Sequence, residues 1–505
     1  MRPSRPARPI ATSANTLRFA VLLLGTFSSL PLLAQSQEWQ LPQRTSQTPE
    51  QDADPRVTRR PKPLTGPVPE PKLAVPDSFA IEAHSSTYMM LFQRAFLPGP
   101  AGAIATPVTS VPTYEYLMLR VVDIDAPWSK NSIDGELSLW GSAILTGADG
   151  QRVMAGDVSV ANVSYRAETT YLKLGRQYVT EGAARFSHLD GTYVSYRAKN
   201  GFALSGYGGF TVLPQWNNRP NYALLGSASD AMVSRPEDFP RATRGGNWMA
   251  GGRVGYSYPK VGELGLSLHE QRENSALGRR DAAVDLHLPG SDFIDGSARA
   301  LVDLDSGGLA DAFLGAALHP MRPLDIAIDY RRMTPTLLMS RQSVLSVFAV
   351  DRFDELGGEA RYQLFRSVQV FAGGFVEWFE NSGHGTRIRS GFRISPDAEH
   401  RILVNGSYTR VTEPENGYHG TRLSVGYRLA QPVMVTAEQY LYLYDHAIRN
   451  VTTSTVHAVT ASYRPSRPFE ILLGGTLFNS PYAAMDAQAM LRLSYTYGAA
   501  LGGEP

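Results

Sequence analysis

Apolar and polar residues alternate through most of this chain, and this alternation limits its fold more than any other feature. Examples are 264–268, 324–330, 421–429 and 485–497, where every second residue is apolar. Successive side chains of a β-strand point to opposite faces, so this pattern gives each strand one apolar and one polar face. It predicts strands that lie between two different environments, from about Ser78 to Tyr497.

A membrane barrel explains this pattern better than a soluble sandwich. The strand candidates run for about ten residues or more, whereas strands of globular proteins usually have about five or six. Apart from 19–33, no apolar run could form a transmembrane helix, and only helices and closed barrels can cross a bilayer. The sequence therefore predicts an all-β fold, a single transmembrane antiparallel β-barrel that occupies residues 78–505.

The strand count and orientation follow from the connections. We expect about 22 strands, within a range of 18 to 24. Their predicted starts lie near residues 79, 113, 133, 152, 169, 187, 200, 246, 261, 279, 293, 310, 322, 354, 367, 385, 400, 418, 432, 450, 467 and 484. Connections from even to odd strands are mostly tight, as at Lys199–Asn200 and Phe365–Arg366, whereas the longest ones, near 93–112, 214–245 and 333–353, run from odd to even strands. Short periplasmic turns opposite long outer loops are typical of outer-membrane barrels, so both chain ends are predicted to be periplasmic.

The N-terminus has the pattern of an export signal. Arginines precede the apolar core Phe19–Leu33, which is short for a bilayer span, and Ala34 is a suitable cleavage position. We interpret 1–34 as a signal peptide, with an uncleaved anchor as the alternative. Residues 35–77 are rich in proline and polar residues, which favours a disordered periplasmic segment. This segment either contacts periplasmic export machinery or serves as an inert spacer.

Composition excludes some classes of function. The 505 residues carry a formal net charge of +1, whereas a nucleic-acid partner would require a strongly basic surface. The absence of cysteine excludes disulfides and thiolate metal sites. Outer-membrane barrels often end on an aromatic residue, and Tyr497 is the candidate here, although Gly498–Pro505 follow it.

One segment carries a resemblance to known barrels. In 171–209, Leu174-Gly175-Arg176-Gln177 ends one strand candidate, and Asp190-Gly191 lies in the next. This hairpin resembles those of large porin-type and alginate-export-type barrels, over about forty residues of the chain. The resemblance implies a large outer-membrane barrel and, more distantly, a partner of polysaccharide export.

If the apolar positions face lipid, the alternate positions line the lumen. The acidic lumen candidates are Asp281, Asp285, Asp295, Asp303, Asp325 and Asp329, and the basic ones are Arg387, Arg389, Arg393, Arg422, Arg428 and Arg492. Opposed acidic and basic arcs would create a field across the bore that orients polar solutes. The alternative is that these residues form ion pairs within the wall and keep it rigid.

Two predicted outer loops are candidates for solute contact. The loop 214–245 contains the candidate sugar contacts Trp216, Asn217, Arg219 and Tyr222, although an ordinary solvated loop has a similar composition. The loop 333–353 is unusually apolar, with Leu337, Leu338 and Phe348. Apolar side chains are costly in water, so this loop either folds into the bore as a constriction or packs on the rim.

Catalysis, metals and cofactors find no support in the sequence. The pair Asp445-His446 lies near no nucleophile motif, and Asp351, Asp354 and Glu355 are explained by a charged loop end as well as by a cation. We therefore predict no enzyme activity, no cofactor, no catalytic residue and no metal site.

The sequence leaves three functions open. The first is an outer-membrane channel for a hydrophilic substrate, with export of a polysaccharide to the cell surface as the specific form. The second is a general or substrate-selective diffusion porin for small solutes. The third is a non-conducting structural or adhesive barrel of the cell envelope. Outer-membrane lipid is the expected partner in all three.

Overall fold

The computed structural model describes residues 79–96, 108–125, 131–145, 154–212, 246–258, 261–288, 293–338, 352–397, 401–414, 416–481 and 483–501. The predicted signal peptide (1–34) and periplasmic segment (35–77) lie outside these described residues. Among the described residues, no helix has the length and apolar character needed to cross a membrane.

The described chain consists almost entirely of strands. Its first half contains β1 (Phe79–Phe96), β2 (Val108–Ser110), β3 (Pro112–Asp125), β4 (Ser132–Ile144), β5 (Met154–Arg166), β6 (Thr170–Val179), η2 (Gly182–Ala184), β7 (Ser187–Arg197), β8 (Phe202–Thr211), β9 (Trp248–Tyr258), β10 (Gly262–Glu273), β11 (Ala276–Leu288) and β12 (Ile294–Asp303). Its second half contains β13 (Leu309–Met321), β14 (Leu324–Met333), α5 (Pro335–Leu338), β15 (Phe353–Phe365), β16 (Val368–Phe379), β17 (Gly383–Ile394), β18 (Ile402–Thr412), β19 (Tyr418–Ala430), β20 (Val433–Ile448), β21 (Val451–Ser466), β22 (Phe469–Asn479) and β23 (Ala483–Leu501).

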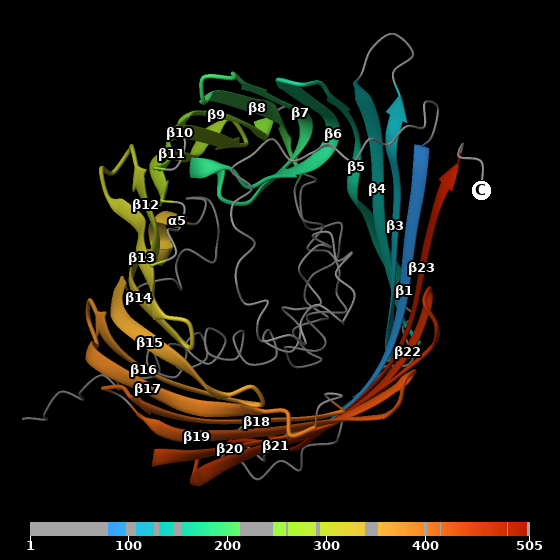
Figure 1. Cartoon of the computed structure of the whole chain (residues 1–505), viewed down its shortest axis with the longest axis vertical. Helices are drawn as coiled ribbons and strands as arrows, with labels where there is room; N and C mark the ends of the chain where they lie inside the picture. Colours follow the sequence, from blue (N-terminus) through green and yellow to red (C-terminus); the bar gives the residue numbers. More distant parts are fainter. Residues whose placement is uncertain are drawn as a thin grey trace, which may run out of the picture. The chain divides into compact units, whose positions relative to one another are not determined.

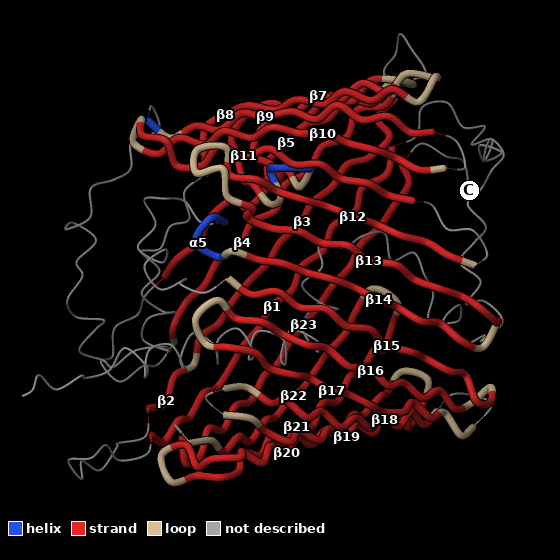
Figure 2. Tube along the Cα trace, turned by 90° about the vertical axis from the view of Figure 1, so that its left-hand side faces the viewer, coloured by secondary structure: helices blue, strands red, loops and turns tan. Residues whose placement is uncertain are grey.

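Each long strand pairs antiparallel with its neighbours in sequence, and the first and last strands close the sheet. β1 pairs with β3 on one side and with β23 on the other, in a register that runs from Phe79 opposite Leu501 to Ala95 opposite Met485. The structure is therefore a closed antiparallel β-barrel of 22 long strands, seen as a ring in Figure 1 and as a tilted wall in Figure 2. The predicted fold class is confirmed.

The predicted strand positions are also close to those observed. The largest difference is three residues, at β11, which was expected from about residue 279 and begins at Ala276. The short β2 was not predicted. It lies within the expected long connection after β1 and pairs with Phe92–Arg94 of β1.

The two rims of the barrel differ in their connections. One rim, named here the short-turn rim, has brief links such as 322–323, 366–367 and 431–432. The other, the long-loop rim, has the connections 97–111, 212–247 and 334–352. The predicted asymmetry holds for these longest connections, but it is not uniform, because β10–β11 and β20–β21 are joined at the long-loop rim by two residues each.

Those two tight links have a simple backbone explanation. Asn274 and Ser275 both have positive φ (50° and 68°), as do Arg449 and Asn450 (51° and 65°). Two successive residues with positive φ are the requirement of a type I′ hairpin turn, whose twist matches that of the strands. Each of these turns contains Asn but no Gly, so the sequence did not distinguish them from longer loops.

The alternation of side chains separates an apolar outer face from a polar inner face. On β10, Leu264, Leu266 and Leu268 are exposed, whereas Ser267 between them and His269 after them are buried. On β23, Tyr495 and Tyr497 are exposed, whereas Ser494 is buried. The predicted alternation is confirmed, and the exposed apolar set has the composition expected of a surface in contact with lipid.

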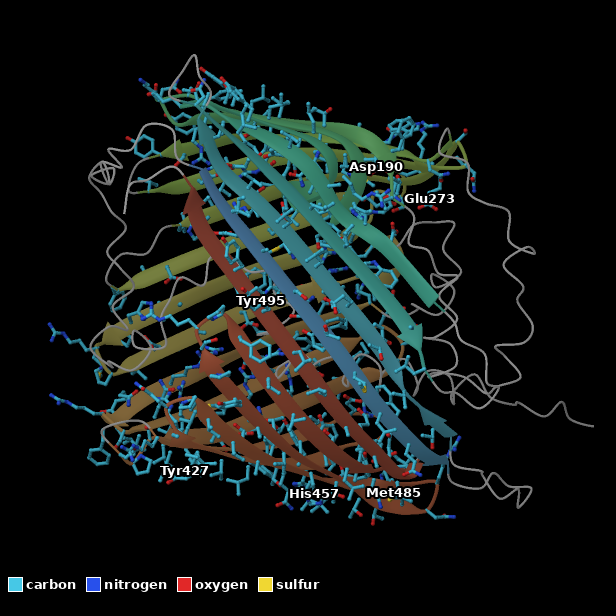
Figure 3. All side chains as sticks on the ribbon, turned by 90° about the vertical axis from the view of Figure 1, so that its right-hand side faces the viewer. Asp190, Glu273, Tyr427, His457, Met485 and Tyr495 are labelled. Carbon is cyan, nitrogen blue, oxygen red and sulfur yellow. The ribbon has the colours of Figure 1, made fainter. Side chains whose placement is uncertain are left out.

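Aromatic side chains are concentrated at the ends of the outer face. Exposed aromatic residues at the short-turn rim include Tyr196, Phe202, Tyr256, Tyr258, Phe365, Tyr427, Tyr463, Tyr495 and Tyr497. Phe210, Trp378 and Tyr408 are exposed toward the long-loop rim. Figure 3 shows Tyr427 toward one end of the barrel, and Asp190, Glu273 and Met485 toward the other. Aromatic girdles at both ends of an apolar band are the arrangement found at the two interfaces of a bilayer.

Candidate functional site on the inner wall

The acidic lumen candidates lie on the inner face of β11, β12 and β14, and most of them have a cationic neighbour. Asp281 is 1 % exposed and accepts a hydrogen bond from Arg279 at 2.5 Å. Asp285 receives two from Arg253, at 3.1 and 2.5 Å. The remaining contacts follow: His319 lies 3.4 Å from Asp295 and 2.7 Å from Asp325, Asp303 accepts from the Ser306 hydroxyl, and Asp329 stands opposite Gly357.

The basic lumen candidates lie on the inner face of β17, β19 and β23, and four of them are paired with glutamates on nearby strands. Arg387 contacts Glu355 and also Glu377 at 3.3 Å, and Arg389 contacts Glu359. Arg422 contacts Glu438 at 3.1 Å, and Arg492 contacts Glu470 at 3.4 Å. Arg393 and Arg428 form no ion pair with any residue that the structure describes.

These contacts favour ion pairing within the wall over two opposed charged arcs. An arginine beside a carboxylate a few ångströms away presents little net field to the middle of the bore, because the two charges largely cancel at a distance. The pairs connect neighbouring strands, as Arg422 of β19 and Glu438 of β20 do. Of the six basic lumen candidates, Arg393 and Arg428, both near the short-turn rim, are the two without an ionic partner among the described residues.

Several inner-wall guanidinium groups also stack on aromatic rings. The guanidinium carbon of Arg387 lies 4.6 Å from the Phe375 ring centroid, and that of Arg389 lies 5.5 Å from it. Arg422 lies 5.2 Å from the Tyr440 centroid. Stacking and ion pairing together hold these arginines flat against the wall, which keeps their long side chains out of the bore.

The connection between β6 and β7 folds inward and packs on the inner surface of the nearby strands β10 and β11. The backbone N–H of Ala183 donates to the hydroxyl of Ser267 on β10 at 2.8 Å. Glu181 accepts hydrogen bonds from Tyr193 at 3.0 Å and from Ser205 at 2.7 Å. We name residues 180–186 the inner loop. It narrows the bore at this height, because its backbone lies on the lumen side of β10 and β11.

Small residues allow the inner loop to lie this close to the wall. Gly182 has a φ of +53°, and a Cβ there would lie 2.3 Å from Oγ of Ser267. Ala183 is completely buried, in an apolar cluster with Ala283, Leu301 and Ala310. The sequence reasoning missed this loop, because Glu181-Gly182-Ala183-Ala184 has no apolar periodicity. Its only signal is a glycine and two alanines between two strands of normal length.

A charged group anchors the far end of the inner loop. Asp311 on β13 is 0 % exposed, and it receives hydrogen bonds from Arg299 at 3.0 and 2.7 Å. Arg185 of the inner loop approaches the same carboxylate to 3.7 Å. Between the loop and the wall is a hollow of about 430 Å³, whose lining includes Thr180, Glu181, Gly182, Arg185, Phe186, Arg253, Asp285 and Arg299.

A second element, α5, lies on the inner side of the same wall (Figure 1). Leu337 and Leu338 pack against the apolar cluster that contains Ala183 and Leu301. The loop 333–353 was expected either to fold into the bore or to pack on the rim. Beyond β14 the structure describes α5 as part of this loop, and α5 lies on the lumen side of the wall. Phe348 and Asp351 lie outside the described residues.

The segment 171–209, which resembles hairpins of other large barrels, contains the β6–β7 hairpin. Two neighbouring residue pairs stand out in it, one charged and one of glycines. Arg176 on β6 lies directly opposite Asp190 on β7 and donates to it at 2.7 and 3.0 Å. Gly175 faces Gly191 across the same pair, and it has a φ of +118°. The Arg176–Asp190 contact lies toward the long-loop rim and joins the two strands that carry the inner loop.

The remaining predicted positions do not form a site in the described structure. The sugar-contact candidates Trp216, Asn217, Arg219 and Tyr222 lie outside the described residues. Asp445 is bound by Arg410, at 2.7 and 2.8 Å. Asp354 accepts from Tyr330 at 2.6 Å, and Glu355 pairs with Arg387. Within the described ranges, no three His, Asp or Glu side chains are grouped so that they could hold a metal ion.

One serine–histidine contact was not expected from the sequence. On β1, Ser86 Oγ lies 2.8 Å from His84 Nε2, and His84 Nδ1 lies 2.9 Å from Thr496 Oγ1. Ser86 also shares a hydrogen bond with Ser494 at 3.1 Å. A nucleophile must reach its substrate, but Ser86 is 4 % exposed. The hydrogen bonds of His84 to Thr496 and of Ser86 to Ser494 instead link β1 to β23 at the seam that closes the barrel.

Comparison with protein-family models and with curated proteins gives no match. Among solved structures, the chain is similar to the translocation pore of the P pilus usher PapC, with a TM-score of 0.43 and 8% identity over 83% of this chain and 99% of that one. It is also similar to OccK9 (OpdG) of Pseudomonas aeruginosa, with a TM-score of 0.41 and 12% identity over 83% and 98%. OccAB4 of Acinetobacter baumannii gives a TM-score of 0.39 and 8% identity over 84% and 99%.

Proposed function

We propose that this protein is an outer-membrane channel for hydrophilic solutes, and that its substrate is a polysaccharide exported to the cell surface. One observation supports the channel function. The same closed barrel has an apolar outer face with aromatic girdles and a polar inner wall. An inner wall of ion pairs and hydroxyl groups is solvated by water, whereas a purely structural barrel could be filled by apolar side chains.

The polysaccharide is the finer part of the proposal, and three features support it. The predicted signal peptide and the proline-rich segment 35–77 suit an exported protein that reaches toward periplasmic machinery. The inner wall carries tyrosine hydroxyls, such as those of Tyr193, Tyr207 and Tyr440, among other hydrogen-bonding groups, and such groups match sugar hydroxyls. Most of the charges on the inner wall are neutralised in ion pairs. A long substrate can therefore move along this wall without being held at one strongly charged site.

Diffusion of small solutes is the second candidate, and the inner loop favours it. Residues 180–186 and α5 both lie on the lumen side of β10–β13, where they reduce the cross-section available to a solute. A narrowed, polar bore is the usual architecture of a pore that selects small molecules by size and charge. Catalysis has no part in either proposal.

Planar-bilayer recording tests the channel function directly. Purified full-length protein should produce discrete conductance steps in a lipid bilayer. Protein that folds and inserts without conductance at any voltage would overturn both channel proposals and leave a scaffold.

Deletion of the gene then separates the two substrates. Loss of surface polysaccharide, with normal uptake of small solutes, is the result expected for export. Unchanged surface polysaccharide with reduced uptake of small sugars or amino acids would overturn export in favour of diffusion.

A further inference from the structure

Two polar side chains lie next to each other on the outer face of the barrel. Gln439 on β20 and His457 on β21 stand directly opposite each other in the strand register, and both are exposed. Side chains two residues apart share a face, so Gln439 lies on the side of the exposed Leu443, and His457 on the side of the exposed Val459. We name Gln439 and His457 the outer polar pair.

The outer polar pair lies deep within the apolar band. Both β20 and β21 have 16 residues, and the pair is near the middle of each strand. Tyr463, in the aromatic girdle at the short-turn rim, lies six residues beyond His457 on β21. Six residues of a strand tilted by about 45° correspond to about 14 Å of depth, in a band about 25 Å tall. Figure 3 shows His457 between Tyr427 and Met485 along the barrel.

Apolar side chains surround the pair on the same face. In the strand register, Leu423 of β19 stands beside Gln439, and Leu477 of β22 stands beside His457. Both leucines are exposed. Toward the short-turn rim, the next outward positions on β20 and β21 are Ala437 and Val459. The two polar groups therefore stand within a surface that otherwise suits hydrocarbon.

Neither member of the pair has a partner within the wall. No hydrogen bond or ion pair joins Gln439 or His457 to a residue that the structure describes. By contrast, His419, also on the outer face, has its Nδ1 atom 2.8 Å from the hydroxyl of Tyr408. Hydrocarbon chains of lipids offer neither donors nor acceptors, so an amide and an imidazole at this depth require a protein partner.

A second copy of the same pair supplies the groups that are missing. The glutamine amide has both donors and an acceptor, and a neutral imidazole has one of each. Two copies inserted in one membrane share one orientation, so a two-fold axis between them runs along the membrane normal and keeps each residue at its own depth. Across such an axis, Gln439 of one copy meets His457 of the other, and symmetry repeats the contact.

We propose that the outer face of β19–β22 is the interface between two copies of this chain, with the outer polar pair at its centre. The four polar side chains of the two copies bond one another, and Leu423 and Leu477 pack around them and exclude lipid. Polar side chains join transmembrane helices for the same reason, because they find no other partner in the bilayer. The inference concerns assembly, so it does not depend on what the barrel conducts.

Crosslinking in isolated outer membranes tests which partner covers this face. The chain contains no cysteine, so one introduced thiol reports on one position. With a short bismaleimide, Ala437→Cys and Val459→Cys should each give a band of twice the monomer mass. Val254→Cys is the matched control, because Val254 is exposed on β9, on the opposite side of the ring (Figure 1), and it should stay monomeric.

The other outcomes of crosslinking contradict the proposal. A band of any other mass at Ala437→Cys and Val459→Cys would identify a partner of different sequence and overturn the contact between copies. The absence of a crosslinked band from both variants would also overturn it, provided that each is folded by its band shift on a gel.

Substitution of the pair tests the hydrogen bonds at the centre. Gln439→Leu combined with His457→Leu suits lipid and should fold, but it should raise the dissociation constant of the dimer in vesicles about tenfold or more. Energy transfer between labelled copies measures this constant. His457→Gln keeps a donor and an acceptor and should retain most of the association.

Thr192→Leu is the control for a general effect of leucine. Thr192 is an exposed polar residue on the outer face of β7, away from the interface, and its replacement should leave association unchanged. Equal association of the wild type and the double-leucine variant would remove the outer polar pair from the interface and overturn the proposal. A wild-type chain that stays monomeric at every ratio of protein to lipid would overturn it as well.

Discussion

At the scale of single residues, backbone contacts and solvent determine which substitutions this wall tolerates. Gly175 has a φ of +118°, and a Cβ there would lie 2.2 Å from the carbonyl oxygen of Ala161. At Gly475 on the same barrel, a Cβ would meet nothing within 4 Å. The two glycines therefore allow the cost of a methyl group to be compared at a crowded and at an open position.

Gly175→Ala should destabilise the barrel by on the order of 1–3 kcal/mol, because it adds both a strained φ and a clash with backbone. Gly475→Ala should change stability by less than about 0.5 kcal/mol. Urea unfolding followed by tryptophan fluorescence measures both. Equal stability of the two variants would show that the φ of Gly175 is not required.

The division between lipid and lumen is also tested at adjacent residues. Ile328 is exposed on the outer face of β14, and Ala327 is on its inner face near Glu359, directly opposite it on β15. Ile328→Arg should lower stability by about 2–4 kcal/mol if the residue lies near the bilayer midplane, because the charge loses its hydration there. Ala327→Arg should be tolerated, since it meets water and a carboxylate.

Refolding yield into lipid vesicles, measured by the shift of the folded band on a gel, compares the two variants. Equal sensitivity would mean that the alternation does not separate lipid from lumen. Ser424 and Val425 offer a similar pair, but Ser424 is 5 % exposed and lies 3.3 Å from Glu438, so an added arginine would be crowded there.

At the scale of elements, the inner loop and α5 form one unit with the wall they cover. Ala183 and the side chains of Leu337 and Leu338 share the apolar cluster on β11–β13, and Ser267 holds the loop backbone. The unit stays in place without an apolar stripe of its own, because the alanines fit a shallow surface that larger side chains would not. A loop of this kind is sensitive to the volume of one residue.

Gly182→Ala should displace the inner loop, because its Cβ would lie 2.3 Å from Ser267 Oγ. Gly307→Ala is the matched control: its φ of +69° resembles the +53° of Gly182, but a Cβ there meets nothing within 4 Å. We expect higher conductance and faster trypsin cleavage at Arg185 in the first variant only. The same behaviour in both would assign the effect to backbone strain rather than to contact with the wall.

The arginines of the inner wall divide into two groups by their partners. Arg389 contacts Glu359, which is only 8 % exposed and is also bound by Arg361 at 2.7 Å, so Arg389→Gln removes one of two cationic partners of a buried carboxylate and should destabilise the barrel by about 1–3 kcal/mol. Arg393 and Arg428 have no ionic partner among the described residues. Their double change to Gln should lower the preference of the channel for anions without loss of stability.

Reversal potentials in a salt gradient measure that preference, and urea unfolding measures the stability of each variant. If Arg389→Gln altered selectivity but not stability, the expected difference between paired and unpaired arginines would be wrong. Conversely, a normal anion preference in the Arg393/Arg428 double variant would show that these two arginines do not set it.

At the scale of the whole molecule, the fold could be predicted because lipid and water impose a period of two on every strand. All 22 long strands were expected within three residues of their observed starts, since each one must present an apolar face to one solvent. Ion pairing within the wall was one of two alternatives, but the individual partners were not predicted. Arg387 and Glu355, for example, are 32 residues apart and meet only through the register of three successive strands.

The inner loop and the grouping of aromatic side chains on β1, β3 and β4 could not be predicted for the same reason. The position of the inner loop depends on the surface of β10–β13 against which it packs, and its own residues have no pattern that indicates it. Tyr88, Tyr114 and Trp140 come from three strands, and only their register places them side by side. Alternation reports the face on which a side chain lies, and it contains no information on which side chains on that face meet.

The orientation of the barrel remains a prediction of the loop lengths. A protease-cleavable tag near Asn218 or Ser340, in the two longest connections, should be cut on intact cells. A tag near Lys260 or Ala430, at the short-turn rim, should be protected until the outer membrane is opened. The reverse pattern of cleavage would invert the proposed direction of every strand.

The closure of β1 on β23 has a consequence for how the molecule is made. Phe79 finds its partner at Leu501, so the contact that completes the wall joins nearly the two ends of the described chain. Contacts between residues so distant in sequence form slowly, because a long loop must be ordered before they contribute any stability. Until β23 is in place, β1 and β22 both have a free edge that can pair with another chain. During assembly, insertion therefore competes with aggregation until β23 pairs with both β1 and β22.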